Sequence, residues 1–357
     1  MHFLQSDTLK NIVKLGSKKA LLWRYHRNQY SFVKKRIKAV LTETRPLGET
    51  EKQLCDAYAQ EVLGWRGYAP WLYLYSLRSG GFKEGWIPEN YFYTEVMPRV
   101  QVGYGEVSNL RCLTHKIFQA DVHPDLAYCI NGNWYLPGGI PVSEPDLFAQ
   151  LSKEEERLVY KLDNSYQGQG IFVVRTTELQ LATMAVKGNG VLQRYIDQHT
   201  FFKQFTSASV ACIRLNTVIA LDGTPELRGA FLRLGQAKDT HVQYFTEIAV
   251  AINLTTGVLD ATGYHPNWTS CRQHPDHNIS FEGLEVPSFQ DAVKTVLALH
   301  SQIPMVGMIG WDVIVNDKNR VVLMEWNGYG SDVAFSEITQ GPCFTGLGWE
   351  HFHKKAK

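Results

Sequence analysis

Two carboxylates near the C-terminal end of the sequence have a spacing that would bring them together. Asp312 and Glu325 lie in two β-rich runs within residues 307–330 (GMIGWDVIVNDKNRVVLMEWNGYG), which are joined by residues 317–320. A hairpin with a loop of two or four residues sets Asp312 opposite Glu325 and places Asn327 on the same face. A three-residue loop would move Asp312 out of this register.

Carboxylates paired in this way call for a compensating cation, because like charges opposite one another destabilise a hairpin. Magnesium prefers hard oxygen ligands, takes one or two carboxylates from the protein and completes its shell with water and phosphate oxygens. The spacing therefore predicts a magnesium site formed by Asp312, Glu325 and Asn327. The alternative that the spacing leaves open is a solvated surface hairpin.

A second candidate site lies in residues 160–174 (YKLDNSYQGQGIFVV), where a strand ends near Lys161 and another strand follows a small polar loop. Gly168 and Gly170 free the backbone to turn its N–H groups toward phosphate oxygens, and Lys161 supplies a point charge. The loop is not a GxxxxGK[ST] motif and no helix follows it, which argues against Rossmann and Walker-type folds. The alternative is an ordinary glycine-containing turn.

The elements that would position these residues are mostly short strands. From about residue 100 the pattern predicts antiparallel sheets in an α+β fold, with one helix at residues 288–301 before the last hairpin. The expected strands are residues 127–130, 133–136, 158–161, 171–175, 191–195, 209–220, 226–233, 246–253 and the hairpin of residues 309–327.

The N-terminal region differs in composition from the rest. Residues 7–41 predict a helix, with Val33, Ile37 and Val40 on one face and lysines between them. Such a basic amphipathic helix contacts an anionic membrane or an acidic partner, or is simply solvated. The aromatic-rich stretch of residues 65–93 favours core and interdomain packing over nucleic-acid binding, because few basic residues are interleaved with it.

The composition is that of a folded protein. Its 357 residues are 44% hydrophobic and 20% charged, enough for about two or three domains. No apolar run approaches the 18 or so residues that span a bilayer, and no secretory signal is recognised at the start, so we expect a cytoplasmic protein. The six cysteines are far apart, which predicts free thiols. Residues 1–45 hold eleven Lys or Arg and two acidic residues, a net charge of +9 against −8 for the rest.

Taken together, these segments resemble the ATP-grasp superfamily, and most closely the sugar-transfer associated ATP-grasp proteins encoded with enzymes of polysaccharide biosynthesis. The resemblance spans most of residues 85–335, through GWIPENYFYTEVMPRV, LTHKIFQADV, VYKLDNSYQGQGI, VLQRYIDQH, VACIRLNTVIALDG and IGWDVIVNDKNRVVLMEWN. It implies two α+β subdomains whose antiparallel sheets hold ATP between them, with a helical N-terminal extension. The domains expected from it are residues 1–105, 106–190, 191–340 and a tail of residues 341–357.

The resemblance also implies roles for single residues. Lys116 and Lys161 would contact the nucleotide phosphates, below a flexible loop that runs from Ser165 through Gly168 to Gly170. The hinge strand along the adenine edge would comprise Gln193, Arg194, Tyr195 and Ile196, with Asp197 near the ribose. Arg214 and Arg233 would act with Lys161 in catalysis, holding the transferring phosphoryl group or the substrate carboxylate. Asp312, Glu325 and Asn327 would be the metal ligands, in agreement with the hairpin.

The activity implied by the resemblance is that of an ATP- and Mg²⁺-dependent ligase. Such a ligase phosphorylates a carboxylate and lets an amine attack the acyl phosphate, giving an amide, ADP and phosphate. The expected substrates are small molecules: an amino acid and a sugar or sugar-linked precursor. Two alternatives stay open: a kinase that uses the same ATP site, and a non-enzymatic nucleotide-binding module at the inner face of the membrane. We expect no nucleic-acid partner.

Overall fold

The chain folds into two compact units. The computed structural model describes residues 3–165, 170–206, 209–236, 239, 241–243 and 245–354, with side chains from residue 19 onwards. One unit consists of Met1–Arg99 and Val333–Lys357, and the other of Val100–Asp332. Both β-sheets belong to the second unit, which therefore carries every candidate site residue. The four-part division expected from the sequence stays a prediction.

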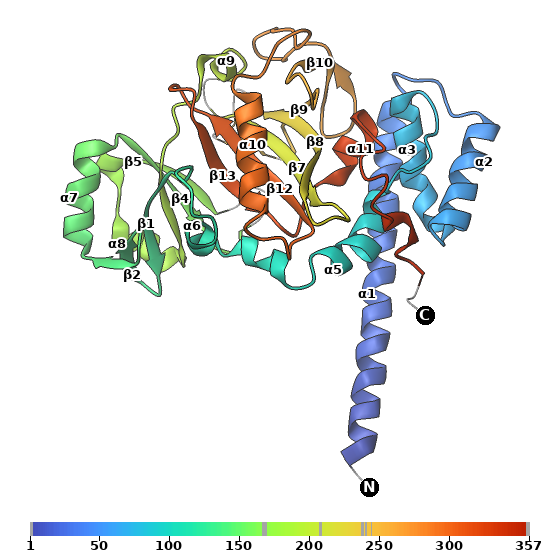
Figure 1. Cartoon of the computed structure of the whole chain (residues 1–357), viewed down its shortest axis with the longest axis horizontal. Helices are drawn as coiled ribbons and strands as arrows, with labels where there is room; N and C mark the ends of the chain where they lie inside the picture. Colours follow the sequence, from blue (N-terminus) through green and yellow to red (C-terminus); the bar gives the residue numbers. More distant parts are fainter. Residues whose placement is uncertain are drawn as a thin grey trace. The chain divides into compact units, whose positions relative to one another are not determined.

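The unit of residues 100–332 contains two antiparallel sheets (Figure 1). Within the described residues, the smaller sheet has the strand order β3-β2-β1-β6-β4-β5, formed by β1 (Asp125–Ile130), β2 (Asn133–Leu136), β3 (Ile140–Val142), β4 (Arg157–Leu162), β5 (Ile171–Arg175) and β6 (Gly190–Arg194). The larger sheet has the order β11-β10-β9-β8-β7-β12-β13, formed by β7 (Cys212–Ile219), β8 (Pro225–Leu234), β9 (Ile248–Ile252), β10 (Leu259–Tyr264), β11 (Ser270–Cys271), β12 (Met308–Val315) and β13 (Val321–Asn327). This arrangement confirms the predicted α+β class.

Each sheet has one apolar face that a helix covers. Helix α10 (Phe289–His300), expected at residues 288–301, buries Phe289, Ala292 and Val296 at helical spacing against the larger sheet (Figure 1). Helices α7 (Glu144–Glu154) and α8 (Leu181–Lys187) cover the smaller sheet, and the Oγ of Ser143 caps the N-terminus of α7 by accepting from the N–H of Asp146. The other face of each sheet carries the polar side chains of the candidate site.

Short helical segments connect these elements in the second unit. They are α5 (Met97–Val100, which begins in the first unit), α6 (Thr114–Ile117), α9 (Thr200–Lys203) and the 3₁₀ segments η4 (Tyr104–Asn109), η5 (Arg111–Leu113) and η6 (Thr176–Glu178).

The other unit is helical. It comprises α1 (Phe3–Val40), α2 (Glu49–Ala57), α3 (Ala69–Ser79), α4 (Glu89–Tyr91), α11 (Val333–Thr339) and the segments η1 (Tyr58–Val62), η2 (Arg66–Tyr68), η3 (Phe92–Val96) and η7 (Trp349–His351). The aromatic-rich stretch packs internally: Trp71, Tyr75, Trp86 and Tyr91 are buried, which confirms the prediction of core packing. The buried carboxylate of Glu337 joins the two ends of the chain by accepting from the N–H groups of residues 87 and 343.

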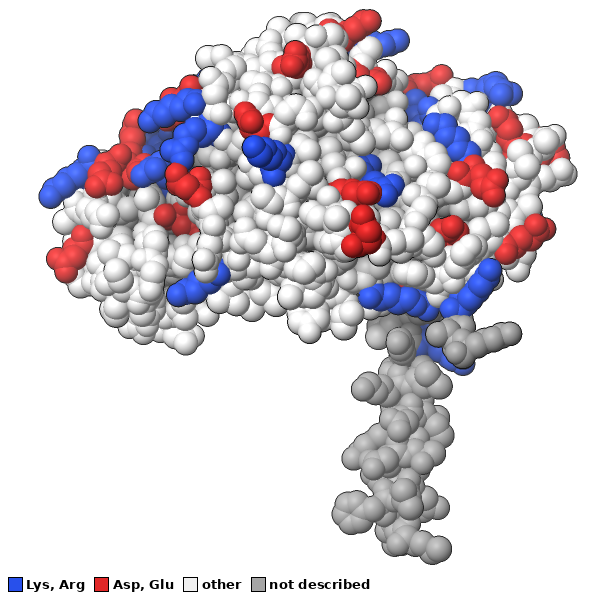
Figure 2. Space-filling model, in the orientation of Figure 1, with Lys and Arg blue, Asp and Glu red and all other residues white. Residues whose placement is uncertain are grey.

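Two observations concern the hydropathy of the helices and the charge of the surface. No helix in the described part of the chain is long and apolar enough to cross a membrane. On the face drawn in Figure 2, Lys and Arg side chains are interspersed with Asp and Glu.

Candidate functional site

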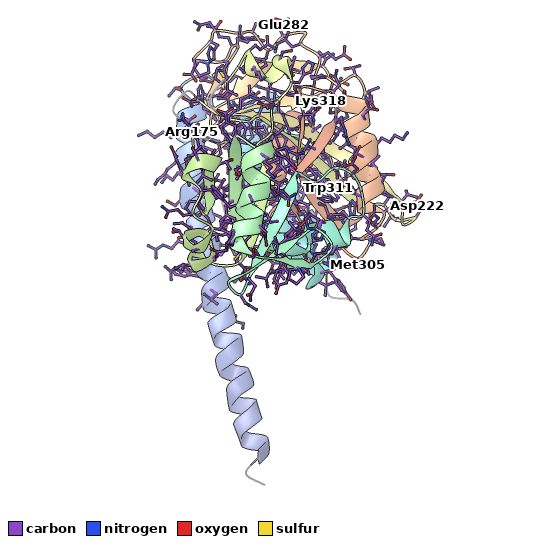
Figure 3. All side chains as sticks on the ribbon, turned by 90° about the vertical axis from the view of Figure 1, so that its left-hand side faces the viewer. Arg175, Asp222, Glu282, Met305, Trp311 and Lys318 are labelled. Atoms are coloured by element: carbon purple, nitrogen blue, oxygen red, sulfur yellow. The ribbon has the colours of Figure 1, made fainter. Side chains whose placement is uncertain are left out.

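The hairpin of β12 and β13 brings the two predicted carboxylates together. Asp312 lies directly opposite Glu325, and Gly310 lies opposite Asn327, which confirms the predicted pairing. Figure 3 shows Trp311 on β12; its side chain is fully buried on the core face, next to Asp312 in sequence but on the other side of the sheet. The strand alternation thus points Asp312 away from the core.

The turn of this hairpin differs from both predicted forms. The N–H of Asn316 donates to the carbonyl of Arg320 (2.9 Å) and closes a three-residue loop around Lys318, with Asn319 in the left-handed conformation at φ 58°. The prediction of a loop of two or four residues was therefore wrong. The register survives because a β-bulge between Asp312 and Val313 restores the one-residue difference that the loop introduces.

Asp312 is a buried carboxylate enclosed by cations. Its Oδ1 accepts from the Nε of Arg214 (2.7 Å) and its Oδ2 from Nη2 of the same guanidinium (3.0 Å), a bidentate pair set up because Arg214 is the β7 partner of Asp312. The Sγ of Cys212 also donates to Oδ1 (3.0 Å). Burial alone would raise the pKa of Asp312, but Arg214 and Arg233 outweigh it and hold the pKa well below its usual range. Asp312 is therefore ionised at neutral pH.

Arg233, on the neighbouring strand β8, is held differently from Arg214. Its Nε and Nη2 donate to the Oε2 of Glu247 (2.7 and 2.6 Å), and its Nη1 lies 3.7 Å from the Oδ2 of Asp312. Arg214 in contrast donates to Asp312 through Nε and Nη2 and to the carbonyl of Ser331 through Nη1 (3.3 Å). The contacts of Arg214 therefore orient Asp312, whereas Arg233 directs one end of its guanidinium toward the carboxylate.

Two cations contact β13 at this point, Arg111 through the side chain of Glu325 and Lys161 through the backbone of Met324. The Nη2 of Arg111 donates to its Oε1 (2.9 Å), while Nη1 and Nη2 of Arg111 donate to the carbonyls of Leu162 (2.7 Å) and Ser165 (3.1 Å). The Nζ of Lys161 donates to the carbonyl of Met324 (3.0 Å). Burial lowers the pKa of Lys161, a cost that Glu325 partly offsets. Lys161 on β4 thus contacts β13 at the residue next to Glu325, near enough for the two charges to interact.

A cavity lies between the two sheets at this point. The smaller sheet contributes Asp125, Val191 and Gln193 to its wall, and the larger sheet contributes residues 323–326. Arg111 also lines the cavity. We call this space the inter-sheet cavity.

The glycine-containing loop is described only at its ends. The Oγ of Ser165 donates to the carbonyl of Leu162 (2.9 Å), and the carbonyl of Gly170 accepts from the N–H of Leu162 (3.0 Å). Gly170 has a φ of 80°, and a Cβ there would lie 2.8 Å from the Cβ of Ser165, so the position requires glycine. Gly168 lies outside the described residues.

The remaining predicted nucleotide contacts are only partly gathered at the cavity. Gln193 lines it, and its amide donates to the Oδ1 of Asp125 (2.7 Å). The exposed Arg194 pairs with Glu155, and Lys116 is exposed on α6.

The positions that follow β6 contact other parts of this unit. Tyr195 stacks under Arg157, whose guanidinium carbon lies 3.8 Å from the ring centroid, and Ile196 packs against the core of the larger sheet. Asp197 is exposed, with its Oδ1 3.8 Å from Arg157. The roles expected for these residues stay predictions.

The donor set at the hairpin fits a magnesium ion. Among the described residues, no three His, Cys, Asp or Glu side chains converge on one point, so a cation here would take two carboxylates and one amide. The Nδ2 of Asn327 donates to the Oδ2 of Asp312 (3.2 Å) and to the carbonyl of Gly310 (3.2 Å), so these two predicted ligands are in contact. Glu325, the third, is the strand partner of Asp312. Two carboxylates with water and phosphate oxygens are what Mg²⁺ accepts.

Three residues of this cluster were missed by sequence reasoning: Arg111, Asp125 and Glu247. Each is a charged residue just outside or at the start of an element, where alternation carries no information about the face. The sequence offered one signal for them, because each predicted buried charge needs a residue of opposite charge nearby. Buried Lys161 and Arg233 each require a nearby carboxylate, and Glu325 requires a cation once it is partly buried.

Comparisons with known proteins found a family match in sequence and a set of similar solved structures. Residues 180–351 match the family described as sugar-transfer associated ATP-grasp. Similar solved structures include the biotin carboxylase–β,γ-ATP complex from Campylobacter jejuni (12% identity, 70% of this chain and 45% of that chain, TM-score 0.43). Another is N5-carboxyaminoimidazole synthetase from Staphylococcus aureus complexed with ADP (9%, 64% and 45%, TM-score 0.40).

A third similar structure is the D-alanine-D-alanine ligase from Coxiella burnetii (13%, 63% and 49%, TM-score 0.34). The chain covers less than half the length of each of these three proteins. No curated protein matches it in sequence. The matched residues 180–351, which are similar to sugar-transfer associated ATP-grasp proteins, include both arginines and all three candidate metal ligands.

Proposed function

We propose that the chain is an ATP- and magnesium-dependent ligase that joins a carboxylate to an amine through an acyl phosphate. The observation that carries the proposal is the contact of two cations with β13 between the sheets, Arg111 with the carboxylate of Glu325 and Lys161 with the carbonyl of Met324. The ion pair of Asp312 and Arg214 lies beside them. Cations from one sheet and carboxylates from the other are what a metal-bound polyphosphate requires. The family match supports the same reaction class.

Each residue has a distinct part in this proposal. Bound Mg²⁺-ATP supplies the phosphoryl group that activates the carboxylate. Lys161 and Arg111 bind phosphate oxygens, and Arg214 keeps Asp312 ionised and oriented. Arg233, held by Glu247, faces the acceptor. Lys116 contacts the phosphates together with the backbone at Ser165 and Gly170, and residues 193–197 lie along the adenine edge and the ribose.

The substrates are proposed from the family alone: an amino acid and a sugar or sugar-linked precursor, in polysaccharide biosynthesis in the cytoplasm. A ligase releases inorganic phosphate only when both carboxylate and amine are present, whereas a kinase leaves a stable phosphorylated product. Screening small carboxylates and amines for joint dependence of phosphate release distinguishes the two. A phosphorylated product formed without any amine would contradict the ligase.

Lys161→Met tests the phosphate site. We expect the variant to unfold at the same temperature as the wild type or a higher one, because it removes a buried charge whose desolvation lowers its pKa. Its affinity for Mg²⁺-ATP should fall by about 10- to 150-fold, the value of a charge-assisted hydrogen bond. Calorimetric titration and ATP-dependent thermal stabilisation measure both effects.

The matched control is Lys153→Met, an exposed lysine on α7. It should leave both measurements unchanged. Wild-type affinity for ATP in Lys161→Met would contradict the assigned role of this lysine, and a wild-type protein that does not bind ATP would contradict the proposed function.

We also propose that α1 contacts an anionic membrane surface. Leu21 and Trp23 are 66% and 64% exposed there, among the exposed basic residues Lys19, Arg24 and Arg27. Apolar side chains that enter the headgroup region together with cations that attract anionic lipid are typical of interfacial helices.

Vesicle sedimentation tests this contact. The wild type should bind vesicles that contain phosphatidylglycerol and not pure phosphatidylcholine, and Leu21→Ser with Trp23→Ser should weaken binding about 10-fold or more. Leu221→Ser, which changes an 83% exposed leucine at the turn after β7, is the control and should bind like the wild type. Equal binding by all three proteins would contradict the role of α1.

A further inference from the structure

One face of α1 carries a groove that has no part in the proposed reaction. It has a volume of about 480 Å³ and lies between exposed side chains of residues 20–31. The side chains that line it are Ala20, Trp23, Arg24, Arg27, Asn28 and Ser31. These positions recur at intervals of three and four residues, so they share one face of the helix. We call this surface the α1 groove.

The opposite face of α1 is packed within its own unit. Val33 and Val40 are fully buried there, and the ring centroid of His26 lies 4.6 Å from that of Trp65. At about 100° of rotation per residue, these positions lie on the side of the helix that faces away from the groove. The α1 groove therefore faces the solvent.

Two guanidinium groups in the groove have no carboxylate partner in the described part of the chain. Arg24 and Arg27 are three residues apart, a spacing that makes side chains neighbours on a helix surface. The sequence has no acidic residue between Asp7 and Glu43, and Glu43 pairs with Arg78 (2.7 Å). Both arginines are therefore available to bind an external anion together.

The neighbouring side chains prepare the groove for such an anion. The guanidinium carbon of Arg27 lies 5.5 Å from the ring centroid of Trp23, a cation–π contact that leaves the N–H groups at the edge of the guanidinium available. Asn28 follows Arg24 by four residues and Ser31 follows Arg27 by four, so an amide and a hydroxyl lie beside the two charges. The α1 groove thus offers several donors to a small anion with several oxygens.

A phosphomonoester at the surface of a membrane fits this groove. It carries a charge of about −1.5 to −2 at pH 7 and three terminal oxygens, whereas a phosphodiester has a single charge and two free oxygens. A groove on one helix is open to water, where exposed ion pairs are weak. At a bilayer, Leu21 and Trp23, which are 66% and 64% exposed, would enter the headgroup region and bring the arginines to the lipid phosphates.

We propose that the α1 groove binds the headgroup of a lipid phosphomonoester, with Arg24 and Arg27 donating to the terminal phosphate oxygens and Trp23 at the level of the headgroups. The inference rests on the proposed contact of α1 with an anionic membrane and does not depend on the ligase activity. It requires the protein to distinguish membranes of equal surface charge by the chemistry of their phosphate groups.

Vesicle sedimentation with two anionic lipids tests this on the wild-type protein. Phosphatidic acid has a phosphomonoester headgroup and phosphatidylglycerol has a phosphodiester. Each lipid is mixed with phosphatidylcholine so that the two kinds of vesicle have the same measured surface potential, and attraction by charge alone then gives equal binding. We expect the affinity for vesicles with phosphatidic acid to be about 10-fold or more higher, the value of a charge-assisted hydrogen bond.

The same assay on variants assigns the preference to the two arginines. Arg24→Lys with Arg27→Lys keeps both charges but replaces each forked donor by a point charge, so the preference should fall to about twofold while binding to phosphatidylglycerol stays unchanged. Both side chains are exposed, so thermal unfolding should match the wild type. The matched control is Arg45→Lys with Arg66→Lys, at arginines of the same unit that are 77% and 72% exposed outside α1. It should keep the wild-type preference.

The outcomes separate this inference from the proposed membrane contact. A wild type that binds neither kind of vesicle would overturn both. Equal affinities at equal surface potential would overturn only the phosphomonoester site, and this comparison needs no variant to fold. A preference that persists in Arg24→Lys with Arg27→Lys would overturn the assignment to these arginines.

A soluble competitor tests the commitment to a lipid. Glycerol 3-phosphate has the same phosphomonoester as phosphatidic acid but no acyl chains, and at the concentration of the lipid it should leave the wild type bound to the vesicles. Complete release by this compound, and not by sodium chloride at the same ionic strength, would identify a soluble phosphate ester as the ligand and overturn the lipid assignment.

Discussion

Glu325→Gln is expected to raise the Mg²⁺ concentration that half-saturates ATP binding by about 10- to 100-fold. It should also lower the rate of ATP consumption with the correct substrates by about 100- to 1,000-fold. The amide keeps the size of the side chain and an acceptor for Arg111 but removes the charge that a cation requires. The side chain is 26% exposed, so the free energy of unfolding should change by only about 1 kcal/mol.

Calorimetric ATP titrations at a series of Mg²⁺ concentrations measure the first effect, and thermal unfolding checks that the fold is kept. Glu282→Gln, at an exposed glutamate labelled in Figure 3, should leave both unchanged. An unaltered Mg²⁺ dependence in Glu325→Gln would remove this residue from the metal site.

Asp312→Asn is expected to act mainly on stability. The variant leaves Arg214 and Arg233 buried without their shared carboxylate, which should lower the free energy of unfolding by about 3 to 5 kcal/mol. Because the two arginines lower the pKa of Asp312, the carboxylate stabilises the wild type at neutral pH, and this contribution is lost only as the pH falls through the lowered pKa. Urea unfolding at neutral and at acidic pH measures both.

A double-mutant cycle provides the control for Asp312→Asn. Combining it with Arg214→Met removes the buried cation as well, so the double variant should be less destabilised than the two single changes added together. Strict additivity would mean that the bidentate pair carries no coupling energy. Reading activity from Asp312→Asn alone would confuse loss of fold with loss of the metal ligand, which makes Glu325→Gln the cleaner test of the site.

The sequence predicts the strands that carry the site better than their turns. Alternation of apolar residues defines β12 and β13, and the pairing of Asp312 with Glu325 follows from it. The predicted length of the loop around Lys318 was wrong. The three-residue loop shifts the register by one residue and the bulge after Asp312 shifts it back, so the pairing at the site is unchanged. Periodicity contains no signal for such a pair of local defects.

Contacts between the two sheets were beyond sequence reasoning. The partner of Lys161 is the backbone carbonyl of Met324, which any residue at that position would provide, and Arg111 comes from a 3₁₀ segment without periodicity. Asp125 likewise lies next to a bulge, which sets the face of β1 on which its side chain lies. These residues are determined by how the sheets meet, whereas the predicted ones are determined by the alternation within a single strand.

The helical unit is discontinuous, since it needs Met1–Arg99 together with Val333–Lys357. A ribosome must therefore synthesise every residue between these segments before α11 can deliver Glu337 to the N–H of Ile87. Until then, part of the apolar surface of the first 99 residues stays exposed. Nascent chains stalled before residue 333 should therefore be bound by chaperones or cut by proteases more readily than completed chains.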